Sequence, residues 1–273
     1  MTYTIDQLKD IAKDVRIDCI KMLTEAGSGH PGGSLSSADL LTALFYTQIH
    51  RTKENALSDD RNRFVLSKGH GVPTLYAIFA QLGILTKQDL LTLRKTGSIL
   101  QGHPDYDRLP EVEASTGSLG QGLSIAQGIA MAGKIDQKDF RVYCMLGDGE
   151  MQEGEIWEGL MSAPKYKLDN LCVILDYNKG QIDGSVENVM NIEPLSDKIK
   201  AFNWHPITID GHNYDEILNA YEEARQTKGK PTFIIAHTIK GKGVSFMEGK
   251  IEWHGSAPSQ EQCDQAIKEL SAL

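Results

Sequence analysis

The stretches VYCMLGDGE (Val142–Glu150) and LCVILDYNKG (Leu171–Gly180) decide the fold of this chain. Each begins as a continuous apolar run of strand length and ends in a polar loop that contains glycine. Three more apolar runs end in the same way: Phe64–Leu66 before SKGHG, Ile207–Ile209 before DGHN, and Phe233–Ala236 before HTIKGKG. Continuous apolar strands that alternate with helix-length segments are typical of a parallel sheet covered on both faces. The sequence therefore predicts an α/β fold, a parallel sheet with helices on both faces.

Helical periodicity fills the intervals between these runs. Thr4 and Gln7 form a capping-box pair, and apolar residues follow them at helical spacing. Further helical segments are expected at about Ser37–Ile49, Ser118–Gly133 and Asn213–Gln226, with a closing helix within Ala257–Leu273. The length of 273 residues is near the size at which a single core stops growing, so we expect one domain over residues 1–273.

Composition excludes several classes of protein. A net charge of -9 argues against nucleic acid or an anionic membrane as the main partner. No apolar stretch approaches the ~18 residues that span a bilayer, and the N-terminus alternates charged and apolar residues, unlike a signal peptide. The cysteines show no close pairing, which argues against a disulfide framework or a CxxC site: Cys19, Cys144, Cys172 and Cys263. We expect a cytoplasmic protein.

Two loops of the predicted sheet carry oxygen ligands. Taken by itself, a GDG sequence such as the one that contains Asp148 is more often a tight turn with an exposed aspartate. Asn178, however, follows the next strand about 30 residues later, the length of one strand–helix–strand unit, so both loops can meet at one sheet edge. A carboxylate, an amide oxygen and a nearby loop carbonyl suit Mg²⁺ or Ca²⁺ and leave positions for phosphate oxygens.

Five of the eight histidines stand beside glycine, and four of these are candidates for a site: His30 in GHPG, His70 in KGHG, His103 in GHPD and His254 in WHG. Glycine lets the backbone approach a ligand closely, while imidazole exchanges protons near neutral pH. The other four have simpler interpretations: His50 and His205 as solvated loop residues, His212 as a local structural residue before a helix, and His237 as a core histidine in a strand.

Seven motifs then stand in order over nearly the whole chain: GSGHPGGSLSSAD, LSKGHG, GHPD, STGSLGQGLSIAQGIA, GDGEMQEGEIWEG, LDYNKGQIDG and IEWHG. Together they resemble the thiamine diphosphate (pyrophosphate-binding) domain of transketolases. The GDG-to-asparagine spacing is general to thiamine diphosphate enzymes, and the four histidine contexts narrow the resemblance to transketolases. The resemblance implies transfer of a two-carbon ketol unit from a ketose to an aldose, as free sugars or sugar phosphates, with thiamine diphosphate and Mg²⁺ or Ca²⁺ as cofactors.

The resemblance also implies roles in cofactor binding. Asp148, Asn178 and the main-chain carbonyl of Gly180 would hold the cation against the diphosphate. The diphosphate itself would contact His70, His254 and the Gly149 amide, while Gly117 would contact the aminopyrimidine and Leu119 and Ile182 would press the cofactor into its bent form. A carboxylate about 4 Å from a phosphate oxygen repels it by ~4 kcal/mol at an effective dielectric of 20, so a diphosphate near Asp148 requires a divalent cation.

Other residues are matched to substrate contacts and to the interface between subunits. His30 and His103 would face the substrate hydroxyls and carbonyl oxygen, with His254 also near the reacting centre. Glu153 and Glu158 match acidic residues that couple paired active sites at the subunit interface, and Lys240 matches a lysine near the substrate channel.

The sequence departs from the family in its extent. Transketolase chains of ordinary length continue into a pyrimidine-binding domain and a C-terminal domain, whereas this sequence stops at Leu273. The pyrimidine-binding domain supplies the glutamate that binds N1′ of the cofactor and the arginines for substrate phosphate. We therefore expect the N-terminal subunit of a split transketolase, which forms an α2β2 heterotetramer and is active only with a separate C-terminal subunit.

Two alternatives stay open. One is a related thiamine diphosphate enzyme, either 1-deoxyxylulose-5-phosphate synthase-like or a transketolase for unusual sugars; Pro31 in SGHPGG favours transketolase over the deoxyxylulose branch. The other is a non-catalytic cofactor-binding or regulatory subunit. His30 and His103 argue against it, because cofactor binding does not require them. The donor ketose and acceptor aldose stay unidentified, because the residues that bind substrate phosphate lie outside this sequence.

Overall fold

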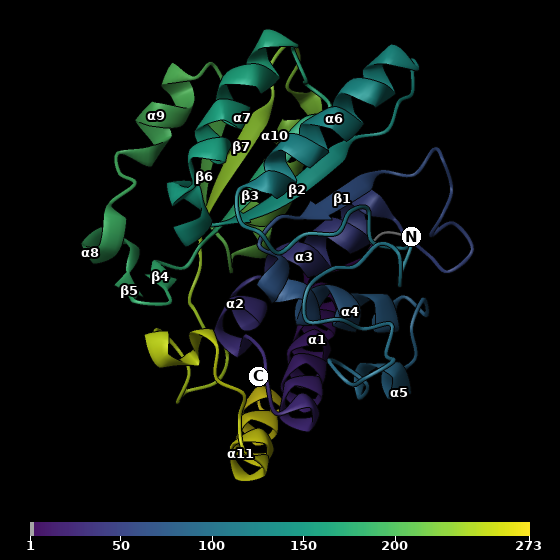
Figure 1. Ribbon diagram of the computed structural model, residues 1–273, viewed down its shortest axis with the longest axis vertical. Helices are drawn as coiled ribbons and strands as arrows, with labels where there is room; N and C mark the ends of the chain where they lie inside the picture. The colour runs from purple at the N-terminus through teal and green to yellow at the C-terminus, as the bar shows by residue number, and fades with distance from the viewer. Residues whose placement is uncertain (1–2) are drawn as a thin grey trace.

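A five-stranded parallel sheet in the order β1-β2-β3-β7-β6 organises the molecule (Figure 1). Its strands are β1 (Arg63–Leu66), β2 (Val142–Gly147), β3 (Leu171–Tyr177), β6 (His205–Asp210) and β7 (Thr232–His237). All four neighbouring pairs are parallel. The computed structural model describes residues 3–273, and it confirms all five predicted strands and the fold class.

Successive side chains of the central strands face two separate cores. In β2, Tyr143 and Met145 pack into one core, whereas Val142, Cys144 and Leu146 pack into the other. This alternation with full burial on both sides explains why the strands read as continuous apolar runs. Both faces of the sheet are therefore covered, as predicted.

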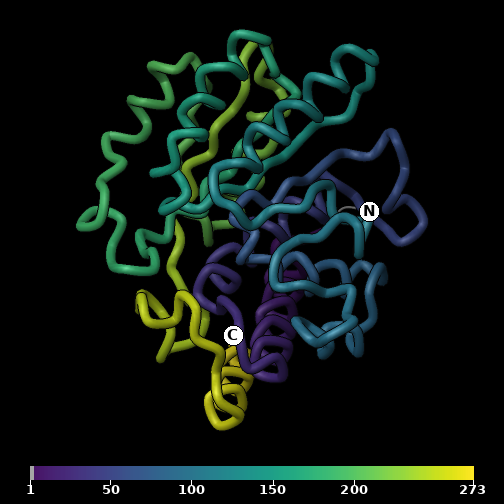
Figure 2. Tube along the Cα trace, viewed as in Figure 1, coloured from purple at the N-terminus to yellow at the C-terminus, as the bar shows by residue number. Residues whose placement is uncertain are grey.

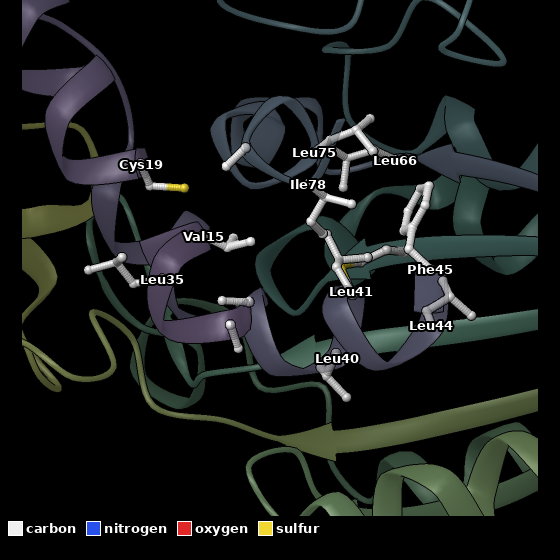
Figure 3. Close-up of a cluster of buried hydrophobic side chains, with 14 of the residues drawn as sticks. Val15, Cys19, Leu35, Leu40, Leu41, Leu44, Phe45, Leu66, Leu75 and Ile78 are labelled. Carbon is white, nitrogen blue, oxygen red and sulfur yellow. The ribbon is translucent and has the colours of Figure 1, made fainter. Parts of the chain in front are cut away.

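The first core lies under helices from both ends of the chain. It is covered by α1 (Ile5–Ala26), α3 (Ala38–Leu44), α4 (Val72–Gln81), α10 (Tyr214–Gln226) and α11 (Gln260–Leu270). Figure 3 shows Val15 of α1, Leu41 of α3 and Ile78 of α4 within this core. The capping box of Thr4 and Gln7 begins α1 as predicted, and α11 packs along α1 beside the C-terminus.

The second core lies under α6 (Gln121–Ile135), α7 (Gly154–Lys165) and α9 (Leu195–Ala201). Helices α6 and α7 cross the near face of the sheet in Figure 1. The predicted helix from Ser118 begins only at Gln121, because Gly117 and Gly120 have φ values of 150° and 92° and keep the preceding residues in a loop. No helix among residues 3–273 is both long and apolar enough to cross a membrane.

Short elements connect the sheet to its loops. They are α2 (Pro31–Ser36), the π-helical turn Phe45–Ile49, α5 (Lys87–Leu90), the β4–β5 hairpin (Gly180–Gln181 and Gly184–Ser185), α8 (Val186–Met190), and 3₁₀ turns at Gly69–Gly71, Gly149–Gln152 and Ile251–His254. Figure 2 shows the chain after β7 running past α2 before it reaches α11. The last 3₁₀ turn and α2 are thereby brought together at the carboxyl ends of the strands.

Candidate functional site

A cleft of about 380 Å³ lies at the carboxyl ends of the strands, where ligands bind in parallel α/β folds. All but one of the residues singled out in the sequence line it: His30, His70, His103, Gly117, Leu119, Asp148, Gly149, Glu153, Asn178, Gly180, Ile182, Lys240 and His254. Glu158 is the exception; it lies exposed on α7. The structure therefore brings these thirteen residues together in one cleft.

Four histidines from four separate loops form one cluster in this cleft. His30 precedes α2, His70 lies in the turn after β1, His103 lies in the loop before α6, and His254 lies in the last 3₁₀ turn. The His30 ring centroid lies 5.3, 6.3 and 5.6 Å from those of His70, His103 and His254. The Nδ1 atom of His30 is buried and has no hydrogen-bond partner within residues 3–273, which is uncommon for a buried polar atom.

The cluster is neutral at pH 7. Burial, followed by the charge of Arg94, lowers the pKa of His30 to about 4. Burial and then Lys240 lower the pKa of His254 to about 3. The same order of causes, burial and then a nearby cation, lowers the pKa values of His70 and His103. Neutral imidazoles have both a donor and an acceptor nitrogen, so they can hold or move a proton at a substrate oxygen.

These lowered pKa values predict a pH-dependent stability. Between pH 6.5 and about 4 these histidines bind more protons in the unfolded chain than in the folded chain, so their contribution lowers the free energy of unfolding as the pH falls. We expect the urea midpoint of the wild type to drop between pH 7 and pH 5, and His30→Gln to drop less. Equal drops in the two proteins would contradict the lowered pKa of His30.

Asp148 and Asn178 lie on neighbouring loops, as their spacing predicted. The Oδ1 of Asp148 accepts a hydrogen bond from the Gly149 amide at 2.8 Å, and its Oδ2 accepts one from Lys179, the residue between Asn178 and Gly180. The amide group of Asn178 donates to Asp176 at 3.3 Å, and its Oδ1 accepts from the Gly180 amide at 3.1 Å. These contacts bring a carboxylate, an amide oxygen and a main-chain carbonyl to one place, a set that fits a hard divalent cation.

A second buried carboxylate, Asp176, explains why Asp148 is the one available to a cation. Asp176 is fully buried and pairs with Lys68, which also donates to the Gly33 carbonyl at 2.7 Å. Burial opposes its ionisation, but the charge and hydrogen bond of Lys68, with hydrogen bonds from Ser36 and Thr238, together lower its pKa. Asp148 has no ion-pair partner within the described residues; burial, and next the charge of Asp176, raise its pKa to about 6. A divalent cation would relieve this unpaired buried charge.

Lys240 lies inside the cleft rather than at its edge. Its Nζ donates to the Gly180 carbonyl at 3.0 Å and lies 3.2 Å from Nδ1 of His254. Burial, and next the charge of Lys68, lower its pKa to about 8. Lys240 thus places a positive charge between the carbonyl predicted to bind the cation and a histidine predicted to contact the diphosphate.

Two glycines allow the backbone to come close to neighbouring side chains. A Cβ on Gly149 would lie 2.8 Å from Oε1 of Gln181, and a Cβ on Gly117 would lie 3.1 Å from the His103 ring. Side chains at these positions would fill the cleft or displace its walls. The chain therefore fits a diphosphate and a divalent cation in both its donor groups and its shape.

Sequence reasoning missed several residues of this site. Lys68, Glu150 and Gln181 also line the cleft, and the buried Asp176 pairs with Lys68 behind it. All four stand within the quoted motifs, Lys68 in LSKGHG, Glu150 in GDGE, and Asp176 and Gln181 in LDYNKGQIDG. A charged residue within or just after an apolar strand was the signal that pointed to Asp176 and Lys68.

The remaining histidines lie outside the cleft. The prediction for His237 was wrong: it is the last residue of β7, and its side chain is exposed beside the ring of Tyr177. His212 is structural, as predicted, but over a long range, because it accepts from the Ile239 amide at 2.9 Å and lies 2.7 Å from Asp39. His50 is exposed, and the partly exposed His205 pairs with Glu223 at 2.6 Å.

Comparison with known proteins gives a consistent result. Residues 7–271 match the family described as "Transketolase, thiamine diphosphate binding domain". The chain is 43% identical to the 6-deoxy-6-sulfo-D-fructose transketolase subunit SqwG of Clostridium sp. (strain MSTE9), covering 96% of each chain. It is 41% identical to one subunit of the apulose-4-phosphate transketolase of Phocaeicola vulgatus, covering 92% of this chain and 89% of that protein.

A solved structure agrees with the sequence comparisons. The transketolase of Campylobacter jejuni superposes with a TM-score of 0.92 at 35% identity, covering 98% of this chain. The chain spans 43% of the length of that transketolase, compared with nearly all of the Clostridium and Phocaeicola proteins. The fold, the cleft and these matches agree. The chain belongs to the transketolase family, and it corresponds to the thiamine diphosphate-binding domain.

Proposed function

We propose that this chain is the cofactor-binding subunit of a two-subunit transketolase, which transfers a two-carbon ketol unit from a ketose to an aldose. The observation that carries the proposal is the cleft itself, because it combines cation ligands with a histidine cluster that cofactor binding alone does not need. The histidine cluster favours an enzyme over a regulatory subunit. The test is ketol transfer to ribose 5-phosphate by this chain together with a pyrimidine-binding transketolase subunit encoded beside its gene.

In this proposal, different residues of the cleft bind the cation and the diphosphate. Asp148, Asn178 and the Gly180 carbonyl would hold Mg²⁺ or Ca²⁺, while His70, His254 and the Gly149 amide would bind the diphosphate. Lys68 and Lys240 offset the acidic character of the chain where the phosphates would lie. When bound, thiamine diphosphate supplies an electron sink for the cleavage of a carbon–carbon bond.

The substrate side of the cleft would be formed by His30 and His103. Because both are neutral at pH 7, each can donate a hydrogen bond to a substrate oxygen or accept a proton from it. The Clostridium and Phocaeicola relatives both carry anionic ketoses in their names, one with a sulfo group and one with a phosphate. We therefore propose an anionic ketose as the donor, in a cytoplasmic heterotetramer with two copies of each subunit.

His103→Ala should lower the turnover number by roughly 10²–10³, the usual loss when one donor to a developing oxyanion is removed. The affinity for thiamine diphosphate should change little, because His103 lies on the substrate side of the cluster. Steady-state kinetics of the assembled enzyme measure the first quantity and calorimetry the second. His50→Ala, at an exposed histidine, serves as the control. An unaltered turnover number at saturating substrates would leave His103 as a loop residue only.

A further inference from the structure

A buried carboxylate that lines the cleft, Glu150, has no part in the roles given so far. Its side chain is 1% exposed. One oxygen, Oε1, accepts hydrogen bonds from the Ser67 hydroxyl and, at 3.0 Å, from the Gly120 amide. The other, Oε2, accepts from the Gly147 amide at 3.0 Å. A single carboxylate therefore binds three donors from three different segments.

Each of these segments leads directly into a part of the cofactor site. Ser67 follows β1 directly and stands three residues before His70. Gly120 follows the loop that contains Gly117, and Gly147 ends β2 next to Asp148. The three segments come from widely separated parts of the sequence, and Ser67 and Glu150 are 83 residues apart. Glu150 is the point at which the three loops are joined.

The chemistry of the contacts requires a carboxylate. Two peptide N–H groups and a hydroxyl converge on the position, and hydrogen bonds to an ionised acceptor are stronger than neutral ones. Within residues 3–273 no cation forms an ion pair with Glu150, since Lys68 is paired with Asp176. An unpaired buried charge is costly, and apolar residues usually fill such a position more stably. A buried charge at this position is therefore expected only if the relative positions of the three loops are important for binding at the cleft.

We propose that Glu150 is a positioning residue that holds the loops of His70, Gly117 and Asp148 in the arrangement that binds thiamine diphosphate and its cation. The proposal rests on the proposed function of the cleft. Without Glu150 the three loops sample other arrangements, and the apparent dissociation constant rises as the binding-competent fraction falls. Glu150 also lines the cleft, and in this proposal it acts by positioning these loops.

Two substitutions and a matched control test this role. Glu150→Ala removes all three contacts, whereas Glu150→Gln keeps an acceptor for Ser67 and Gly120 but turns an amide group toward the Gly147 N–H. Gln127→Ala is the control, because Gln127 is a buried polar residue of α6 that bonds Gly159 at 2.9 Å, away from the cleft. For each protein, calorimetry of the complex with the pyrimidine-binding subunit measures thiamine diphosphate binding in Mg²⁺, and hydrogen exchange of the apo chain follows the Gly120 and Gly147 amides.

We expect the dissociation constant to rise roughly 10- to 100-fold in Glu150→Ala and by an intermediate factor in Glu150→Gln, because the competent fraction falls by those factors. Gln127→Ala should lower the melting temperature and leave the dissociation constant within about twofold. Exchange of both glycine amides should accelerate in the Glu150 variants alone. Unchanged affinity and exchange, with a lowered melting temperature only, would overturn the proposal. Absent cofactor binding by the wild-type chain assembled with its pyrimidine-binding subunit would instead reject the proposed function, while the exchange data would still decide the role of Glu150.

Discussion

Asp148→Ala should abolish Mg²⁺-dependent binding of thiamine diphosphate, the largest effect expected of any single substitution in this chain. The neighbouring carboxylate, Asp176, is bound to Lys68 and buried, so it cannot replace the lost ligand. Substituting an outer-shell partner of a metal ligand already costs about 10–100-fold in affinity, and Asp148 is proposed as a ligand itself. We therefore expect a loss of more than about 100-fold.

The fold should survive this substitution. Burial raises the pKa of Asp148 to about 6, above its ordinary value of 3.8, so the ionised group destabilises the folded chain at pH 7. Removing it also loses the bonds from Gly149 and Lys179, and the two effects oppose each other. The apo variant should therefore unfold at a urea concentration close to that of the wild type.

Asp183→Ala is the matched control. Asp183 is an exposed carboxylate that lines the same cleft, so the substitution makes the same change in net charge without touching the predicted ligands. Calorimetric titration with thiamine diphosphate, with Mg²⁺ and with a chelator, separates the two variants. Equal affinities for wild type and Asp148→Ala would contradict the assignment of Asp148 as a metal ligand. An equally large loss of affinity in Asp183→Ala would show that the loss comes from the change in net charge.

The parts of the fold that the sequence predicted are those with local causes. Buried parallel strands are continuous apolar runs, and the loops that follow them must meet at one edge of the sheet. For this reason Asp148 and Asn178 were placed together correctly from spacing alone. The glycines before α6 illustrate the limit of local patterns, since the apolar periodicity begins before the helix does.

The contacts that sequence reasoning missed are between residues far apart in the chain. Lys68 and Asp176 are 108 residues apart, and only the register of β1, β2 and β3 brings them together. Glu150 meets Ser67 for the same reason. The error for His237 has a related cause, because the apolar pattern of β7 does not show where the covering helices end.

The isolated chain should not catalyse multiple turnovers of ketol transfer. In the family, the 4′-amino group of thiamine diphosphate becomes a base through a glutamate at N1′, and the pyrimidine-binding domain supplies that glutamate. The rim of the cleft also exposes apolar side chains, with Ile182 71% and Met190 62% accessible. Ile182 and Val189, itself 40% accessible, line the cleft directly. Exposed apolar groups gathered beside a binding site are typical of a surface that a partner covers.

Reconstitution with the pyrimidine-binding subunit tests this surface and the partner together. Size-exclusion chromatography should show a larger complex after mixing, and transfer from xylulose 5-phosphate to ribose 5-phosphate should appear only in the mixture with Mg²⁺ and thiamine diphosphate. Ile182→Asp should weaken both complex formation and transfer, because it places a charge in an interface that excludes water. Leu57→Asp, at a 57% exposed leucine before β1 and away from the cleft, should leave both unchanged. Sustained transfer by the purified chain alone would refute the two-subunit proposal, since the activating carboxylate would then have to lie within this chain.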